Sequence, residues 1–590
     1  MNQSYPVVAV TVVVLATVLV GGFGLRISRT TSDFYVASRT VGPALNAAAI
    51  SGEYLSAASF LGIAGLVLLH GPDMLWYPVG YTAGYLVLLV FVAAPLRRSG
   101  AYTLPDFAEG RLQSRAVRRL VSVFVVGAGW LYLVPQLQGA GLTLKILTGA
   151  PGWFGGVLVA LVVVAAVAAG GMRSITFVQA FQYWLKLTAL LVPAFFLVLA
   201  WQGDGRPSVA AGLTGAVAGR VDHPLYATYG LIVATFLGTM GLPHVVVRFY
   251  TSPNGRAARR TTVVVLALIG AFYLLPPVYG ALGRLYVPQL PSGTDADAAV
   301  LLLPERAIGG LGGDLLGALV AGGAFAAFLS TASGLTMAVA GVLTQDVLPS
   351  RGVRDFRLAT PLAIAVPLGG SLLVSSMPVA DSVAMAFAVS ASSFCPLLVL
   401  GIWWRRLTPP GAAAGLLLGG GLSFAATVAT VGGAVRSGWP HALLAWPAVW
   451  SVPVGFLAMI LVSLATPGRI PPGTGAAMAR FHLPEALVPR GGDGRDGLCG
   501  GAATGAVDGR RARAGSGAGP GADAGPGCRS AGSVRDRGPA PDRGTVSGRG
   551  AAPGRTGASG RTGAPDPADV SDPEDVSDRA GVRGRTTEAP

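Results

Sequence analysis

Long apolar runs, separated by short polar segments, fill the chain between residue 6 and residue 465. A helix of about 20 apolar residues spans a bilayer, so these runs predict thirteen membrane-spanning helices. They are expected at residues 6–25, 43–69, 74–96, 119–147, 152–172, 176–201, 226–250, 262–287, 312–344, 359–378, 380–404, 411–432 and 445–465. The pattern predicts an all-α polytopic membrane protein whose transmembrane domain covers residues 1–466.

The second run is interrupted near its centre by the small or polar residues Ser51, Gly52, Glu53, Tyr54 and Ser56. A carboxylate at this depth in a bilayer is costly. Non-helical backbone is tolerated there only where protein buries it or where it lines a cavity. The interruption therefore predicts a binding site at which the helix unwinds around a polar ligand.

Arginines gather in alternate loops, and this asymmetry orients a membrane protein because basic loops stay in the cytoplasm. With thirteen spans, the cytoplasmic arginines are Arg26, Arg29, Arg39, Arg97, Arg98, Arg111, Arg115, Arg118, Arg119, Arg173, Arg248, Arg256, Arg259, Arg260, Arg351, Arg354, Arg357, Arg405 and Arg406. The first span has no basic residue before it, so it is expected to stay as an anchor and not to be cleaved as a signal peptide. We expect a multi-pass cell-membrane protein with its N-terminus outside and its C-terminus in the cytoplasm.

The composition changes beyond the last run. The whole chain is 52% hydrophobic and 12% charged with a net charge of +15, but residues 467–590 become rich in Gly, Ala, Arg, Pro and Asp. Such a segment predicts a largely disordered cytoplasmic tail. Its arginines alternate with aspartates and lack stacking aromatics, so no nucleic-acid partner is expected. Cys395, Cys499 and Cys528 have no metal-ligand spacing, and no metal other than a coupling ion is expected.

The ninth run carries a second polar feature. Ala327, Ser330 and Thr331 are spaced i, i+3 and i+4, so one carbonyl and two hydroxyls fall on one helix face. These oxygens suit a small hard cation, and carbonyls freed by unwinding around Gly52 and Leu55 would add two more. The alternative is that the hydroxyls bond carbonyls of their own helix or join helices together.

No nucleophile elbow, P-loop or metal cluster occurs in the sequence, so an enzyme is not expected. An ion gradient is then the expected energy source, because it delivers about 2.3 kcal/mol per charge per 100 mV. Secondary active symport fits these features.

Several phrases together resemble the sodium:solute symporter family. They are GEYLSAASFLGIAG, SGAYTLPDFAEGRL, the Gly170–Gly171–Met172 turn followed by TFVQ, GTMGLPHVVVRFYT and a small-residue ninth run ending in TQD. Their order matches over roughly residues 30–465, and the cation/acetate branch is the most similar. The resemblance implies a five-plus-five inverted repeat (a LeuT-like core) over about residues 43–404. It also implies one Na⁺ between the broken second run and the ninth run, bound by Gly52, Leu55, Ala327, Ser330 and Thr331.

The substrate side of the site follows from the same break. A short carboxylate such as acetate suits the N-terminal end of the half-helix that starts at Ser56, with Glu53, Tyr54 and Ser59 beside it. Glu53 would repel an anion, so it is expected to contact the cation, to be protonated, or to pair with a cation such as Lys186.

Gating and specificity leave alternatives open. Pro243, His244 and Arg248 are assigned a gating or structural role, and Arg248 is interpreted as an interfacial anchor with a packing role. The coupling ion is Na⁺, with H⁺ as the alternative. Other solutes on the same scaffold are proline, pantothenate or a sugar, and a transporter-like sensor is a more distant alternative. No cofactor is expected, and the sequence predicts no oligomeric state.

Overall fold

The computed structural model describes residues 4–27, 31–208, 223–288, 290, 294–347, 352–373, 377–435, 437–484 and 487, and every regular element in them is helical. The first half contains α1 (Ser4–Ile27), α2 (Thr31–Val36), η1 (Ala37–Arg39), α3 (Pro43–Tyr54), η2 (Ala58–Gly62), α4 (Ile63–His70), η3 (Pro72–Leu75), α5 (Trp76–Phe91), α6 (Ala93–Ser99), α7 (Leu104–Leu112), α8 (Arg115–Thr148) and α9 (Gly152–Gly203). The second half contains α10 (Pro224–Gly241), α11 (Pro243–Phe249), α12 (Gly255–Tyr273), α13 (Pro276–Tyr286), η5 (Thr294–Ala298), α14 (Ala299–Ile308), α15 (Gly310–Asp346), α16 (Val353–Leu373), α17 (Val379–Trp403), α18 (Pro409–Gly415), η6 (Leu416–Gly421), α19 (Leu422–Val431), α20 (Gly438–Ala445), α21 (Ala448–Ala465), η7 (Pro467–Arg469) and α22 (Thr474–His482). Of the two compact units of the chain, Met1–Ala506 holds all of these elements, and Val507–Pro590 lies outside the described residues.

Within these residues, nine helices are long and apolar enough to cross a membrane, and two bent helix pairs bring the number to eleven. α9 counts once among the nine, although 52 residues of helix measure about 78 Å, more than twice the ~30 Å core of a bilayer. Gly171 interrupts it at φ 56°, ψ −158°, so its two halves correspond to the two expected spans at 152–172 and 176–201. α16 was expected as a span and is not among the nine. All thirteen expected spans coincide with helices, and the number of crossings stays a prediction.

The first bent pair is α3 with η2 and α4, which turn by 71° across a short break. The break falls at Leu55 and Ser56, where Leu55 leaves helical geometry at φ −73°, ψ 88°. Gly52 lies against the backbone of α9, because a Cβ there would come within 2.1 Å of the Gln179 carbonyl oxygen. The expected interruption of the second run is confirmed.

The second bent pair is α10 with α11, which turn by 41°. Leu242 is extended at φ −61°, ψ 118°, and Pro243 begins α11. Proline disfavours helical geometry in the preceding residue and has no N–H for the helical ladder. Pro243 therefore lies at a break that its own chemistry explains.

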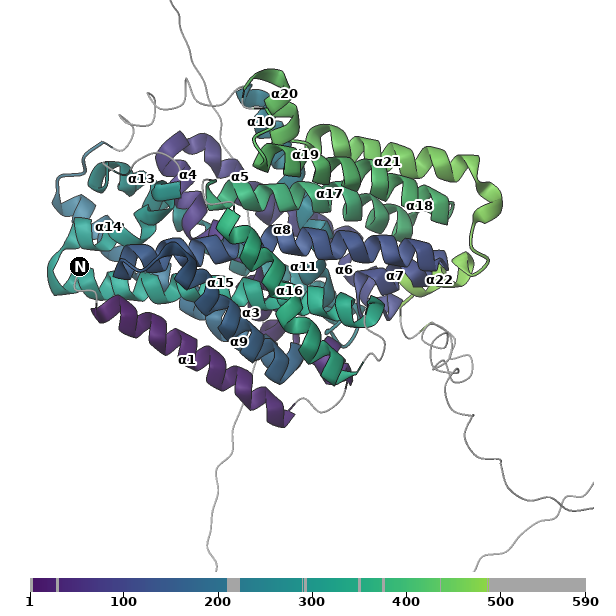
Figure 1. The fold of residues 1–590 in the computed structure, drawn as a ribbon, viewed down its shortest axis with the longest axis horizontal. Helices are drawn as coiled ribbons and strands as arrows, with labels where there is room; N and C mark the ends of the chain where they lie inside the picture. The colour runs from purple at the N-terminus through teal and green to yellow at the C-terminus, as the bar shows by residue number, and fades with distance from the viewer. Residues whose placement is uncertain are drawn as a thin grey trace, which may run out of the picture. The chain divides into compact units, whose positions relative to one another are not determined.

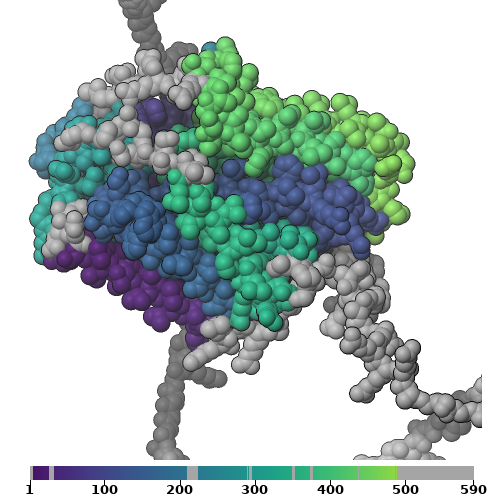
Figure 2. All heavy atoms as spheres, viewed as in Figure 1, coloured from purple at the N-terminus to yellow at the C-terminus, as the bar shows by residue number. Residues whose placement is uncertain are grey.

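The broken helices lie among the long helices of the bundle. α3 contacts α9 and α12, α10 contacts α5 and α17, and α15 contacts α8 and α9. Figure 1 shows α1 lying along α9 and α15, which agrees with its contacts to both. The last helices, α18 to α21, gather on the side of α17 in green in Figures 1 and 2.

The surface of the bundle is apolar. Large exposed side chains on α1, α9 and α21 include Leu19, Phe195 and Leu461, whose exposed fractions are 71%, 61% and 61%. A water-soluble monomer rarely exposes apolar patches of this extent, whereas lipid is their natural solvent. The helices therefore suit a bilayer, as the sequence predicts.

The expected tail begins with ordered structure. η7 and α22 lie inside residues 467–590, and α22 contacts α6 and α7. Met478 and Phe481 are buried at 2% and 4% exposure, and the Phe481 ring lies 5.7 Å from that of Phe107. Two apolar side chains thus anchor α22 to the bundle, and the domain boundary at 466 stays a prediction. Residues 488–590, with Cys499 and Cys528, lie outside the described part of the chain.

Candidate cation and substrate site

The expected cation ligands come together between α3 and α15, with the side chain of Lys186 from α9 among them. The Lys186 ammonium donates to the Leu55 carbonyl at 2.7 Å and to the Ser330 hydroxyl at 2.9 Å. It also donates to the Gly52 carbonyl. All four residues are buried, and Lys186 is 0% exposed. A tethered positive charge thus lies where the sequence predicts a cation.

The other two expected ligands have partners within the protein. The Ser330 hydroxyl donates to the Ala327 carbonyl at 3.1 Å, which is the local bond of the alternative interpretation. The Thr331 hydroxyl donates to the Glu53 carbonyl at 2.6 Å and ties α15 to the end of α3. The ion-binding role of these five residues stays a prediction.

Whether a Na⁺ ion suits this arrangement depends on free oxygens. An ammonium has three N–H donors, and here each has one acceptor: two carbonyls and one hydroxyl. A Na⁺ ion would need the same oxygens and would lie beside a positive charge. The residues, as arranged here, do not fit Na⁺ and Lys186 together.

Glu53 pairs with a cation, which is one of the expected alternatives, but the cation is Arg248 and not Lys186. Its carboxylate accepts from Arg248 Nε at 2.6 Å, and both side chains are about 1–2% exposed. Arg248 also donates to Thr176 at 2.8 Å and to the Gln179 amide oxygen. Arg248 is 1% exposed and therefore does not lie at the membrane interface as expected, because α11 is a short half-helix turned into the bundle. Its gating or structural role stays a prediction.

Gln179 is a site residue that sequence reasoning missed. Its amide oxygen accepts from Arg248, and its amide nitrogen donates to the Ser330 carbonyl at 2.8 Å. It therefore connects the buried ion pair to the helix that carries the expected cation ligands. The available signal was the TFVQ phrase, residues 176–179, which follows the Gly171 break.

The expected substrate residues line an aromatic region beyond the break. The Tyr54 hydroxyl lies 2.7 Å from that of Thr239, and the Ser59 hydroxyl lies 2.9 Å from that of Tyr273. The Tyr54 ring packs edge-on against Tyr85 with centroids 4.8 Å apart. Tyr54 and Ser59 therefore have protein partners and serve as walls.

Tyr132 of α8 lies between Ser56 and His244 and is close to both. Ser56 lies beside the Tyr132 hydroxyl, and the Tyr132 and His244 rings are 5.3 Å apart. His244 is 1% exposed, and neither of its ring nitrogens has a hydrogen-bond partner among the described residues. Buried polar groups normally have partners. This histidine is therefore available to a ligand.

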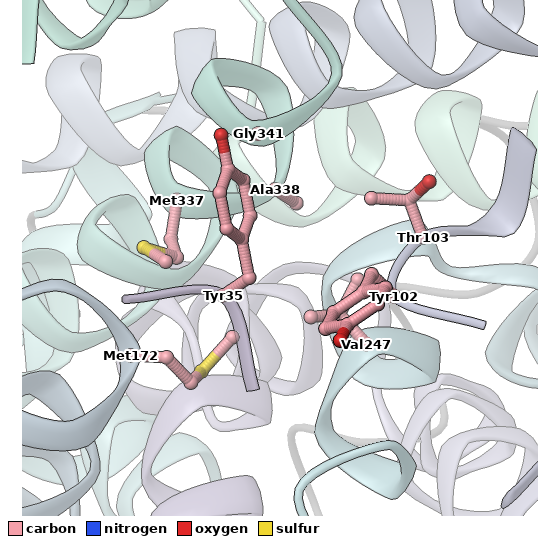
Figure 3. Close-up of a pocket in the computed structure, with 8 residues that line it drawn as sticks. All are labelled: Tyr35, Tyr102, Thr103, Met172, Val247, Met337, Ala338 and Gly341. Carbon is pink, nitrogen blue, oxygen red and sulfur yellow. The ribbon is translucent and has the colours of Figure 1, made fainter. Parts of the chain in front are cut away.

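A small pocket lies where the loop residues Tyr102 and Thr103 meet α11 and α15. It is lined by Tyr35, Tyr102, Thr103, Met172, Val247, Met337, Ala338 and Gly341. Figure 3 shows the Tyr35 ring standing beside Met337 and Gly341, with Met172 below it. On α15 these residues follow Gly334, against which the Glu53 carboxylate packs. The pocket thus adjoins the Glu53–Arg248 pair.

No group of three or more His, Cys, Asp or Glu residues in the described part of the chain could hold a metal ion. The features described above are typical of a membrane transporter with broken helices around a central site. The model of the family described as "SSF: Sodium:solute symporter family" matches residues 34–419. The chain belongs to the sodium:solute symporter family.

Two relatives align with this chain over most of their own length. The uncharacterized symporter YwcA of Bacillus subtilis (strain 168) is 32% identical over 467 residues, which are 75% of this chain and 90% of the relative. A monocarboxylic acid transporter of Corynebacterium glutamicum is 31% identical over 465 residues, which are 70% of this chain and 82% of the relative. Family membership supports a solute symporter with Na⁺ as its coupling ion.

Solved structures share the fold. A Na⁺-coupled sialic acid symporter in a substrate-bound, outward-open state has a TM-score of 0.62 at 14% identity and covers 78% of this chain and 98% of its own. The nucleobase-cation-symport-1 transporter Mhp1, in a closed conformation, has a TM-score of 0.50 at 13% identity and covers 76% and 98%. The fold is therefore the all-α, five-plus-five inverted repeat that the sequence predicts, and the two bent pairs begin its two halves.

Proposed function

We propose that this protein is a cation-coupled symporter that carries acetate or another short monocarboxylate into the cell. The observation that carries the proposal is the break between α3 and η2, where carbonyl oxygens from α3 and a hydroxyl from α15 surround a positive charge. Such a break at the interface of the repeats is where transporters of this architecture bind ions and solutes. The relative in Corynebacterium glutamicum supports the monocarboxylate.

The carboxylate would bind between Ser56, Tyr132 and His244. A histidine N–H and two hydroxyls are suitable donors to an anion, and the surrounding rings of Tyr54, Tyr85 and Phe387 exclude water from its alkyl group. The backbone N–H of Ala57 donates to the Gln136 side chain at 2.9 Å. Side chains, more than the first N–H of the half-helix, would therefore hold the substrate.

Transport would follow from relative movement of the two repeats. The Glu53–Arg248 pair joins α3, which begins the first repeat, to α11, the second part of the bent pair that begins the second repeat. Val247, which lines the pocket of Figure 3, directly precedes Arg248 in α11. Separation of α3 from α11 would break the ion pair and open a route through that pocket to the arginine-rich loops. With the orientation expected from the arginines, this route leads to the cytoplasm.

Uptake into proteoliposomes tests the proposal. Labelled acetate, pyruvate and propionate are offered with an imposed Na⁺ gradient, an imposed proton gradient, or neither. We expect accumulation above the external concentration only with a cation gradient, and mutual competition among the three acids. Competition by proline, pantothenate or a sugar, without competition by acetate, would overturn the monocarboxylate proposal.

A further inference from the structure

The cation in the helix break belongs to the protein itself. Three oxygens converge there, and Lys186 supplies three N–H donors to them. Neither the ammonium nor these three acceptors needs an additional partner. We propose that Lys186 permanently replaces Na⁺ at this site, so that transport does not require Na⁺ to bind there. This inference rests on the proposed function only for its consequence in transport.

The charges around the break agree with this assignment. Glu53 acts on the charge of Lys186, and its carboxylate oxygen already bonds Arg248 at 2.6 Å. Two unit charges 4 Å apart repel by about 1 kcal/mol in water and about 4 kcal/mol near a protein surface. A Na⁺ ion added beside Lys186 would meet this repulsion without a free counter-charge from Glu53.

The choice of lysine is specific in this chain. Lys145 and Lys186 are its only lysines, among 43 Lys and Arg residues in total. An ammonium is a compact point charge with donors that rotate, whereas a guanidinium is a planar fork. Three oxygens from two helices match the first geometry and not the second. The oxygens of Gly52, Leu55 and Ser330 therefore hold the compact ammonium of Lys186 in the position of a bound cation.

A tethered cation also has a mechanical consequence. Na⁺ can leave a site when α3 and α15 separate, but Lys186 stays attached to α9. The neighbouring turn of α9 is fixed to α1, because Gln182 donates to the Thr17 hydroxyl at 3.0 Å. Lys186 therefore ties the ends of α3 and α15 to a third helix.

The test is thermal unfolding of the purified full-length protein in detergent. NaCl is titrated against choline chloride at constant ionic strength and constant pH, without substrate. The variants are Lys186→Ala, which removes the ammonium, Ser330→Ala, which removes one ligand, and Lys145→Ala, which removes the exposed lysine as the matched control. A ligand that binds the folded state raises its unfolding temperature in a saturable way.

We expect Na⁺ to leave the unfolding temperature of the wild type and of Lys145→Ala unchanged. Lys186→Ala should unfold at a lower temperature in choline, and Na⁺ should raise it by a few degrees in a saturable manner, because the vacated oxygens then accept the ion. A saturable Na⁺ shift in the wild type that Ser330→Ala removes would overturn the proposal. This comparison stands even if Lys186→Ala does not fold.

Uptake separates this inference from the proposed function. If wild-type proteoliposomes accumulate acetate equally well in Na⁺ and in choline under a proton gradient, both proposals are supported. If no monocarboxylate accumulates under any gradient, the proposed function fails. The Na⁺ titration still decides whether Lys186 fills the site.

Discussion

The two broken helices begin equivalent halves of the fold but treat their polar groups differently. At the break after α3, Lys186, Glu53 and Arg248 are all paired within the protein. At the break before α11, His244 is buried and both its ring nitrogens lack partners among the described residues. The first break thus pairs its charged groups within the protein and leaves the buried Ser51 and Ser56 hydroxyls without partners among the described residues, whereas the second leaves a titratable ring without partners there. Charge is therefore neutralised at the first break, while unpartnered polar groups lie at both breaks.

The largest expected effect comes from variants that remove one partner of the ion pair between the two broken helices. Glu53→Ala leaves Arg248 buried without its carboxylate, and Arg248→Ala leaves Glu53 without its cation. Each should lower the free energy of unfolding by about 3–5 kcal/mol and abolish uptake. Denaturant or thermal unfolding of the purified variants measures the first effect.

A partly exposed ion pair provides the comparison for that experiment. Arg173 contacts Asp33 at 3.0 Å, with 38% of the Arg173 side chain and 7% of the Asp33 side chain exposed. Ser38 also donates to Asp33 at 2.6 Å, so Arg173→Ala should cost less than the core variants, about 1–3 kcal/mol. The double variant Glu53→Ala, Arg248→Ala should cost less than the sum of the single variants. A sum that is simply additive would show that the pair does not couple the two helices.

Close backbone approach also distinguishes the breaks. A Cβ at Gly52 would lie 2.1 Å from the Gln179 carbonyl oxygen, whereas one at Gly241 would lie 2.7 Å from that of Ser390. Gly52→Ala should therefore cost about 3 kcal/mol and Gly241→Ala about 1–2 kcal/mol. Unfolding temperatures of the two variants test this order.

Gly270 is the matched control for these substitutions. It lies in α12 with nothing within 4 Å of its added Cβ, so Gly270→Ala should be neutral or stabilise by up to about 1 kcal/mol through helix propensity. Equal losses at Gly52 and Gly241 would remove the distinction that we draw between the two breaks.

The second break should respond in function more than in stability. His244→Phe keeps a ring against Tyr132 and removes two unpartnered nitrogens, whose burial carries a desolvation cost. We expect the free energy of unfolding to change by less than about 1 kcal/mol and the KM for acetate to rise. Tyr226→Phe, remote at the Trp446 carbonyl, serves as control. A large loss of stability with unchanged KM would assign His244 a structural role.

The smallest expected effect concerns Asp297 of η5, which packs against α4 of the first broken helix. Asp297 of η5 is 1% exposed and lies where a Cβ at Gly65 of α4 would meet its carboxylate at 2.5 Å. Burial raises the pKa of Asp297 to about 7, while the N–H of Val379 opposes this and the charge of Asp381 adds to it. A raised pKa means that the contribution to stability is complete below about pH 4 and is lost as the pH rises through about 7.

Thermal unfolding between pH 4 and pH 8 measures this contribution. The unfolding temperature should fall by about 1–2 °C as Asp297 ionises, and Asp297→Asn should flatten that part of the profile. Asp73 of η3, whose side chain lies at the surface, offers Asp73→Asn as the control. A profile that Asp297→Asn leaves unchanged would contradict the assignment.

The sequence was sufficient to predict the broken helix because Ser51, Gly52 and Glu53 interrupt an apolar run of membrane length. It also predicted which residues of α15 face that break, because Ala327, Ser330 and Thr331 share one helix face. It could not predict the partner of Lys186, because a sequence contains no spatial distance between Lys186 and Gly52, which are 134 residues apart.

Arg248 illustrates a second limit. Counting hydropathy along a run assumes a straight helix and so assigns its last residues to the membrane surface. The bend of 41° after Leu242 instead turns α11 and Arg248 into the interior. A different limit applies at α22. Met478 and Phe481 are too few apolar residues for the helix to be recognised in the sequence, but they are enough to pack it on the bundle.

Because the chain has only two lysines, their rates of chemical modification can be compared directly. Amine-reactive reagents have two lysine side chains to modify, one exposed at Lys145 and one buried at Lys186. Modification of Lys145 reports that the reagent is present, and modification of Lys186 reports that α3 and α15 have parted from α9. The ratio of Lys186 modification to Lys145 modification, followed over time by mass spectrometry, measures how often the bundle opens at Lys186.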